Sequence, residues 1–279
     1  MALRVIVDSG SDLPVLVAQE KNIEIVPLKI LFGEESFVDI IELSQDQFYY
    51  KMRESKHIPV TSLPSPQDFI DVFKKQSPED DIVVITISSK ISGTHQSAVI
   101  AKEMLPEYNI EIVDSLNVSM AAGHLALTAV EMAQEGCPLE EIVETLNEIK
   151  KEIHSFILID DLTNVIKGGR ISNWKGSLAK VFKIKPTLYL TPEGEIHVKD
   201  NARGRKKQIV KALSFIDDLG KNESSKKIYL MHSMAKEDEI AYVKEQLSQR
   251  FNGSEVAVLR LGAIMGSHGG FGTIGLIIT

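Results

Sequence analysis

The sequence predicts two α/β domains whose sheets are mostly parallel and partly mixed. Short apolar runs alternate with longer amphipathic segments along the 279 residues, and strands alternating with helices are typical of α/β layers. Several apolar runs lack polar alternation, as strands covered on both faces do. A Pro-Glu-Gly turn at 192–194 separates two further runs, which indicates an antiparallel hairpin and therefore a mixed sheet.

Each predicted strand is an apolar run of strand length. The runs are Leu3–Val7, Ile25–Phe32, Ile82–Ile87, Ile110–Val113, Phe156–Ile159, Ile184–Leu190, Ile228–Met231, Val256–Leu261 and Thr273–Ile278.

Helices are predicted where apolar residues recur at spacings of three and four. Ser65 can cap one of these helices, with Pro66 in its first position and Asp68 completing a capping-box pattern. Gly136 ends another, as glycine commonly does. The predicted helices cover 66–75, 120–134, 139–153, 203–219 and 236–251.

The domain boundary is predicted near residue 155, where the charged helix 139–153 is followed by a new strand from Phe156. The two domains would then be 1–155 and 156–279. Since no long linker separates them, we expect them to pack closely. Domain interfaces are common places for ligand pockets.

Composition narrows the class of protein. The net charge of −8 disfavours nucleic acid or an anionic membrane as the main partner, leaving at most transient membrane contact. The single cysteine, Cys137, excludes an internal disulfide and fits a reducing, cytoplasmic compartment. The run Leu3–Val7 is broken by Arg4 and closed by Asp8, unlike a signal peptide. No apolar stretch approaches the ~20 residues of a membrane span.

Three turns rich in hydroxyls and glycine are candidate sites for a small anionic head group. Thr61 and Ser62 precede a capped helix, and the Ser-Gly-Thr sequence at 92–94 separates a strand from a helix. The third turn is the glycine-rich segment 266–272, which contains His268. Hydroxyls and free N–H groups at a helix N-terminus suit a carboxylate or a phosphate. Each turn alone also fits ordinary turn chemistry or helix capping.

Two acidic residues follow the first strand. Asp8 lies where the strand ends, a place where α/β proteins bind ligands. Asp12 is interpreted as a cap of the following helix. A role for Asp8 in ligand binding and a structural role remain equally open.

Two basic features have both a structural and a functional interpretation. Gly169 is predicted to end a short helix, and Arg170 either pairs with an anion or complements the helix C-terminus. The run from Arg203 through Arg205 to Lys207 opens a predicted helix at its unfavourable end. It is either a solvated face or a docking patch for an acidic partner or a phosphate.

The sequence lacks the motifs of several kinds of catalytic and metal site. The sequence shows no Walker loop, zinc-ligand spacing, EF-hand or His-Glu-x-x-His helix, so no metal is expected. A hydrolase would use Ser92 or Ser267 as nucleophile, His268 as base and Asp114 as orienter, but no Gly-x-Ser-x-Gly elbow is present. A small-anion binding protein is a further alternative.

Taken in order, these motifs resemble the DegV family, which contains the fatty-acid-binding subunits of bacterial fatty acid kinase. The resemblance runs from residue 5 to the C-terminus. It departs from the family at Phe271, where a proline is usual between two glycines. The motifs are Asp8-Ser9-x-x-Asp12-Leu13, Thr-Ser-x-Pro-Ser-Pro at 61–66, Ile-Ser-Ser at 87–89, Ser-Gly-Thr at 92–94, Asp114-Ser115, Gly-Gly-Arg-Ile at 168–171, Lys185-Pro186 and the closing Gly-x-His-x-Gly.

The resemblance implies two α/β domains with a fatty acid between them. It implies a protein that buries the long acyl chain and presents its carboxylate to a separate ATP-dependent kinase subunit. That subunit would form an acyl phosphate for phospholipid synthesis, with an acyltransferase as a further partner. This chain would itself supply no catalytic residue, cofactor or metal, and Arg203 and Arg205 are expected to contact the kinase. The implied ligand-binding residues are Thr61, Ser62, Ser92, Gly93, Thr94, Gly169, Arg170 and His268.

Overall fold

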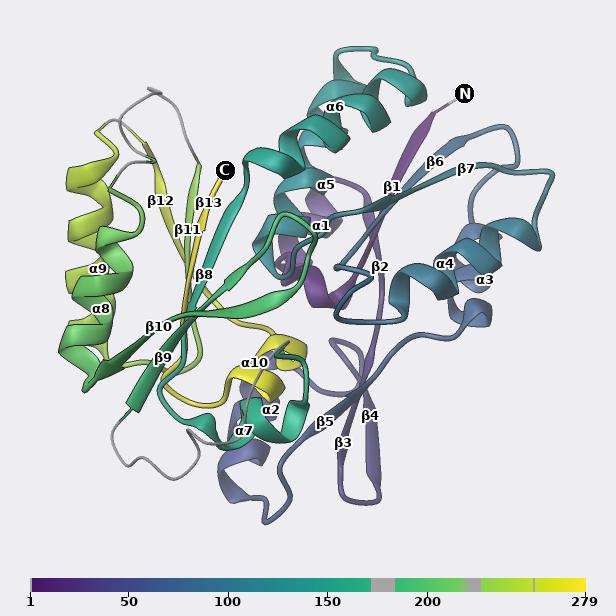
Figure 1. Ribbon diagram of the computed structural model, residues 1–279. Coiled ribbons are helices and arrows are strands. Elements are labelled where there is room, and N and C mark those ends of the chain that lie inside the picture. Colours follow the sequence, from purple (N-terminus) through teal and green to yellow (C-terminus); the bar gives the residue numbers. More distant parts are fainter. Residues whose placement is uncertain (1, 172–183, 218, 220–226, 253) are drawn as a thin grey trace. The chain divides into compact units, whose positions relative to one another are not determined.

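The computed structural model describes residues 2–171, 184–217, 219, 227–252 and 254–279 (Figure 1). The chain forms two compact units. Unit 1 contains the residues up to 152, and unit 2 contains most of the remainder. Two short segments of the C-terminal half, 192–194 and 262–267, also belong to unit 1. The predicted α/β class with mixed sheets is confirmed.

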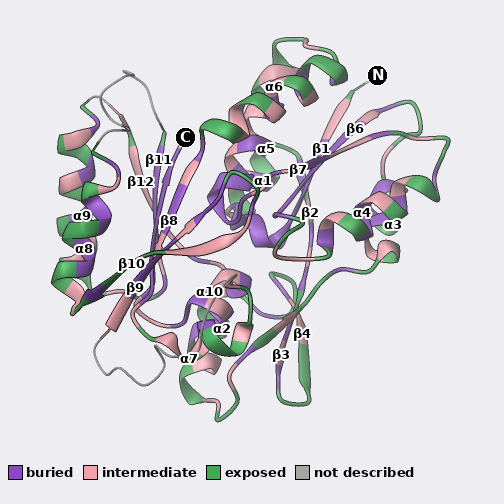
Figure 2. Ribbon diagram, in the orientation of Figure 1, coloured by how far each residue is buried: buried purple, intermediate pink, exposed green. Residues whose placement is uncertain are grey.

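Unit 1 is built on a parallel four-stranded sheet of order β2-β1-β6-β7. Helices α3 and α4 cover one face through a core that includes Phe69, Phe73 and Ala98, while α5 and α6 contact β1, β6 and β7. Most residues of the two central strands, β1 and β6, are accordingly buried (Figure 2), which explains their lack of polar alternation. The elements are β1 (Leu3–Asp8), η1 (Ser9–Ser11), α1 (Val15–Glu20), β2 (Ile23–Val26), α3 (Pro66–Phe73), β6 (Asp81–Thr86), α4 (Thr94–Glu103), β7 (Asn109–Asp114), α5 (Met120–Gln134) and α6 (Leu139–Glu152).

A three-stranded sheet of order β4-β3-β5 accompanies it in unit 1. The predicted strand Ile25–Phe32 is in fact two strands, β2 and β3, which belong to different sheets. Pro27 separates them, because proline has no N–H to continue a ladder. The chain is fixed there by Leu28, whose N–H donates to Ser9 Oγ at 3.0 Å. The elements are β3 (Lys29–Phe32), β4 (Glu35–Val38), α2 (Gln45–Glu54) and β5 (Val60–Ser62).

Unit 2 contains a six-stranded sheet of order β10-β9-β8-β13-β11-β12. Within the described residues only the pair β11 and β12 is parallel, so the parallel character of the fold is concentrated in unit 1. The predicted hairpin between β9 and β10 is confirmed as an antiparallel pair. The elements are β8 (His154–Leu158), α7 (Leu162–Gly168), β9 (Ile184–Leu190), β10 (Ile196–Arg203), α8 (Arg205–Ser214), β11 (Ile228–His232), α9 (Glu237–Arg250), β12 (Val256–Arg260), α10 (Ala263–Gly269) and β13 (Ile274–Ile278).

The sheet of unit 2 is apolar on both faces. Helices α8 and α9 pack on one face through a core that includes Leu213 and Val243. A second cluster joins Val165 of α7 to Leu188 and Val198 of the sheet. Helix α10 follows β12 and contains His268.

Three aspartates, Asp8, Asp12 and Asp39, are buried near one another in unit 1. Asp8 caps η1, and its carboxylate accepts N–H bonds from Gly10 and Ile87, both at 2.8 Å. Asp12 does not cap α1, whose N-cap is Pro14, so the predicted cap was wrong. Its carboxylate instead binds the Ser119 hydroxyl at 2.5 Å and the Gly262 N–H at 2.9 Å.

Burial raises the pKa of all three carboxyl groups. Loss of hydration raises the pKa of Asp8 to about 7, that of Asp12 to about 8 and that of Asp39 to about 6. Because these values lie above the ordinary carboxyl pKa, the folded state binds more protons than the unfolded state between about pH 4 and 8. The stability that depends on Asp12 is therefore fully present at low pH and is lost as the pH rises through about 8.

We predict that Asp12→Asn makes the protein more stable than the wild type at pH 8 and that the difference shrinks toward pH 4. An asparagine can accept from Gly262 and donate to Ser119 but cannot ionise. The expected gain at pH 8 is about 1–3 kcal/mol, the cost of an incompletely compensated buried polar group. Thermal unfolding at both pH values measures it. Parallel pH profiles for the two proteins would contradict the assignment.

Candidate functional site

Two of the predicted head-group turns lie next to each other in unit 1. Thr61 and Ser62 end strand β5, where Thr61 pairs with Ile30. The following residue, Leu63, lies beside Gly93, because a Cβ on Gly93 would be 3.1 Å from Leu63 Cδ2. The structure therefore brings the Thr61 turn and the Ser92 turn together.

The second turn presents a polar helix start. The hydroxyls of Ser92 and Thr94 are 2.8 Å apart, and the Thr94 N–H donates to Ser92 Oγ. Gly93 is the N-cap of α4 and provides no side-chain bond to the first turn of the helix. A helix N-terminus carries a partial positive charge. Hydroxyl groups and helix polarity therefore suit a carboxylate here.

His268 packs against the end of α7 in unit 2. A Cβ on Gly168 would lie 2.6 Å from His268 Nδ1, so only glycine fits this position without a shift. Gly169 adopts φ +65° as the C-cap of α7, which confirms the predicted helix end. Arg170 follows and donates to the Gly168 carbonyl at 2.5 Å. The structure thus brings His268, Gly169 and Arg170 together.

The His268 imidazole is neutral near pH 7. Burial lowers its pKa to about 4, with the Arg170 charge adding to the effect. A neutral imidazole has one N–H donor and one acceptor. It can therefore form a hydrogen bond to an anion without neutralising the anion's charge, while the exposed Arg170 guanidinium provides a positive charge nearby.

The proposed hydrolase groups are engaged in structural contacts. Ser267 is buried in α10, and its hydroxyl donates to the Ala263 carbonyl at 2.7 Å. The Asp114 carboxylate accepts N–H bonds from Ser89 and Leu116. These contacts disfavour Ser267 as a nucleophile and Asp114 as the group that orients a catalytic histidine.

The sequence analysis did not identify a second apolar cluster in unit 2. Ile157, Leu188 and Val198 lie on neighbouring strands and pack with Val165 of α7, apart from the α8 and α9 core. The signal was present in the sequence as apolar residues on both faces of these strands. Val165 and Leu188 are themselves buried in this cluster.

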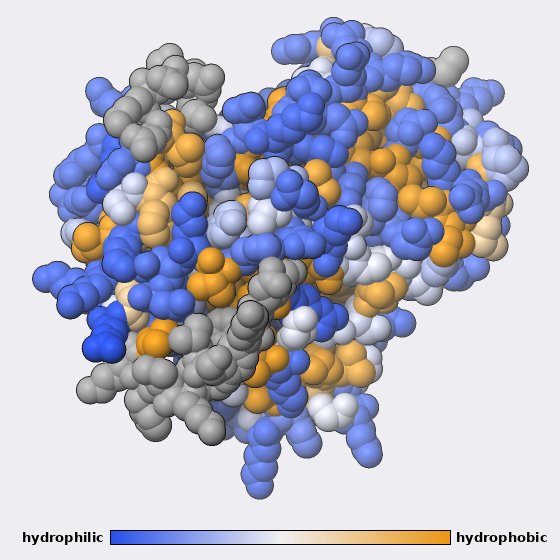
Figure 3. Space-filling model, in the orientation of Figure 1, coloured by the Kyte–Doolittle hydropathy of each residue, from blue (hydrophilic) through white to orange (hydrophobic). Residues whose placement is uncertain are grey.

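Charged and polar side chains dominate the face seen in Figure 3, with smaller apolar areas between them. No helix among the described ranges is long and apolar enough to cross a membrane. Within these same residues, no cluster of three or more histidine, cysteine or acidic side chains is placed to hold a metal ion.

The two arginines of the basic run have different surroundings. Arg203 is the exposed last residue of β10, and α8 begins only at Arg205. The Arg205 side chain is 13% exposed and forms an ion pair with Glu239 at 3.0 Å. Lys206 and Lys207 are exposed. The exposed part of the run is therefore Arg203, Lys206 and Lys207.

Comparison with known proteins gives matches along the whole chain. The model of the DegV family, which is described as a family of uncharacterised proteins, matches residues 2–279. A DegV domain-containing protein of Listeria innocua is 32% identical over 276 residues, which are 98% of this chain and 97% of the relative.

Solved structures agree with this match. A fatty-acid-binding DegV family protein from Thermus thermophilus has a TM-score of 0.90 and 30% identity, and the likeness covers 100% of this chain and 99% of the other. A DegV family protein from Ruminococcus gnavus, refined with vaccenic acid, has a TM-score of 0.89 and 27% identity, with 99% of each chain covered. By sequence and by fold, this protein belongs to the DegV family.

Proposed function

We propose that this protein binds a long-chain fatty acid. The likeness over the full chain to DegV proteins that bind fatty acids carries the proposal. The hydroxyl turns of unit 1 and the neutral histidine beside Arg170 in unit 2 support it. The residues proposed for the carboxylate are Thr61, Ser62, Ser92, Gly93, Thr94, Gly169, Arg170 and His268.

The acyl chain provides most of the proposed affinity. Each buried methylene contributes about 0.8 kcal/mol, and a long-chain acid has roughly 15 of them. The apolar surface around Leu188 and Val198 in unit 2 is proposed as part of its contact area. The head-group residues then need only offset the lost hydration of the carboxylate.

The protein is further proposed to act in the cytoplasm as the substrate-presenting subunit of a kinase system. A separate ATP-dependent subunit would transfer the γ-phosphoryl group of ATP to the carboxylate, giving acyl phosphate and ADP. The attacking atom is the carboxylate oxygen of the lipid, so this chain needs no nucleophile of its own. An acyltransferase would consume the acyl phosphate in phospholipid synthesis.

The first prediction of the proposed function is that the purified protein carries a long-chain fatty acid. Organic extraction followed by mass spectrometry detects it, and adding acids of ~14 to 18 carbons should raise the thermal midpoint of any ligand-free fraction. If extraction gives only ligand-free protein and no acid shifts the midpoint, fatty acid binding is wrong. Extraction of a phosphorylated or sugar ligand would favour the small-anion alternative.

A second prediction concerns the head group. Ser92→Ala and His268→Ala should each weaken fatty acid binding by about 1–3 kcal/mol, roughly 5- to 150-fold in Kd, because each removes a polar contact to a carboxylate. Titration with a fluorescent fatty acid measures the affinity. Ser89→Ala removes an exposed hydroxyl outside the proposed set and serves as a control. Equal affinities for all four proteins would refute the residue assignment.

A third prediction concerns the exposed basic run. Reversing Arg203 and Lys207 to glutamate should lower acyl phosphate formation with the kinase subunit at least tenfold and leave fatty acid affinity unchanged. The defect should shrink as salt is added to both proteins, since exposed charges mainly steer association. Lys244→Glu, an exposed change on α9, is the control for charge. Full turnover by the double variant at low ionic strength would make the run an ordinary solvated surface.

A further inference from the structure

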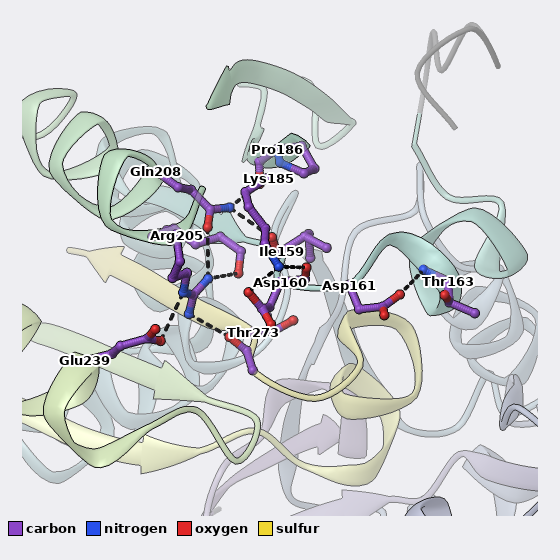
Figure 4. Close-up of polar contacts among 12 residues, drawn as sticks. Ile159, Asp160, Asp161, Thr163, Lys185, Pro186, Arg205, Gln208, Glu239 and Thr273 are labelled. Carbon is purple, nitrogen blue, oxygen red and sulfur yellow. Dashed lines mark hydrogen bonds and ion pairs between the residues drawn. The ribbon is translucent and has the colours of Figure 1, made fainter. Parts of the chain in front are cut away.

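Arg205 is turned into unit 2 and bridges three parts of it (Figure 4). Its Nε donates to Glu239 Oε2 of α9 at 3.0 Å, and its Nη1 donates to Gln208 Oε1 at 3.0 Å. Its Nη2 donates to the Gly272 carbonyl at 2.7 Å. With Arg205 only 13% exposed and Glu239 only 17% exposed, the pair is screened from water far more than a surface ion pair.

The Gly272 contact reaches the segment that follows His268. We name residues 268–273, which comprise the last two residues of α10 and the turn before β13, the histidine loop. Its backbone has φ +73° at Gly270 and φ +78° at Gly272, values that glycine adopts without strain. Glycines also give the loop little stiffness of its own, so its shape depends on the groups that bind it.

Ser233 binds the histidine loop from the end of β11. Its hydroxyl donates to the Gly270 carbonyl at 2.5 Å. Its carbonyl accepts the Gly272 N–H at 2.6 Å, and its own N–H donates to the Thr273 carbonyl at 2.9 Å. Together with the Arg205 contact, these bonds engage the loop backbone at Gly270, Gly272 and Thr273.

A second ion pair lies on the other side of Gly272. A Cβ on Gly272 would be 2.9 Å from Asp160 Cβ. Asp160 is itself held by Lys185, whose Nζ donates to its Oδ1 at 2.7 Å and to its carbonyl at 2.6 Å (Figure 4). Asp160 leads into α7, whose last residue Gly168 lies against the imidazole. His268 therefore lies against α7, and Arg205 binds the loop residues that follow His268.

We propose that Arg205 is a positioning residue, which together with Glu239 fixes the histidine loop and so the orientation of His268 toward the fatty acid carboxylate. The inference rests on the proposed function. A guanidinium is required because its planar fork can reach the Glu239 carboxylate, the Gln208 amide and the Gly272 carbonyl at once, whereas the single ammonium of lysine cannot. Arg203 lies two residues earlier and is exposed, so the proposal gives it no role in positioning the histidine loop.

The test compares Arg205→Lys and Glu239→Gln with Arg203→Lys as the matched control, using the full chain as purified. Amide hydrogen exchange at Gly270, Gly272 and Thr273 reports on the loop, and ¹⁵N-histidine NMR reports on the His268 ring. For Arg205→Lys we expect exchange in the loop at least tenfold faster, a shifted or broadened His268 signal and fatty acid affinity reduced about 5- to 50-fold. Amides of β12 should keep their wild-type protection.

Glu239→Gln retains a hydrogen-bond acceptor without the charge, so it should give a smaller effect of the same kind. It also provides the test if Arg205→Lys fails to fold. Arg203→Lys should match the wild type in every measurement. An unchanged loop and His268 signal in both Arg205→Lys and Glu239→Gln would overturn the proposal, as would an equal rise in exchange over the whole of unit 2. Loop effects in a protein that binds no fatty acid would support the positioning role and refute the proposed function.

Discussion

The carboxylates of Asp8 and Asp12 hold together the loops at the C-terminal ends of the parallel strands in unit 1. Asp8 joins the turn after β1 to the N–H that follows β6, and Asp12 joins the same turn to Ser119 and Gly262. Among the described residues their hydrogen-bond partners are backbone N–H groups and the Ser119 hydroxyl, not cations. Their burial is costly in the ionised form, which makes this anchoring sensitive to pH.

Close approach explains the high glycine content near His268. A side chain at Gly262 would overlap Asp12 Oδ1, and one at Gly266 would meet Tyr49 and Phe48 of α2. At Gly168 it would overlap the imidazole of His268 itself. Close packing therefore accounts for a glycine at each of these three positions.

Local sequence patterns predicted the features that depend on local contacts. The Ser65 capping box, the Gly169 helix end and the hairpin between β9 and β10 are all present. The predictions were wrong where contacts between residues far apart in the sequence determine the structure. Asp12 was interpreted as a helix cap, yet its N–H partner Gly262 lies 250 positions along the chain. Likewise the burial of the Arg205 side chain depends on Glu239, which lies 34 positions away, so no local sequence pattern predicts it.

The same limit applies to the candidate site. Hydroxyl turns and a histidine among glycines could be recognised from residue types, because small polar groups at helix starts suit anions. The neutral state of His268 could not, since it arises from burial and from the Arg170 charge brought near it by folding. Nor could the apolar surface around Leu188, which depends on which strands become neighbours.

The neutral imidazole fits the chemistry of the proposed reaction. The nucleophile in that reaction is the carboxylate oxygen of the bound lipid, and an oxygen fully neutralised by cations attacks phosphorus poorly. Hydroxyls and a neutral histidine can orient the carboxylate while leaving most of its charge in place. Arg170 is exposed and bonded to the Gly168 carbonyl, so its charge is partly directed elsewhere. Under the proposed function, a site of this kind would bind the acid mainly through its acyl chain and would keep the head group reactive.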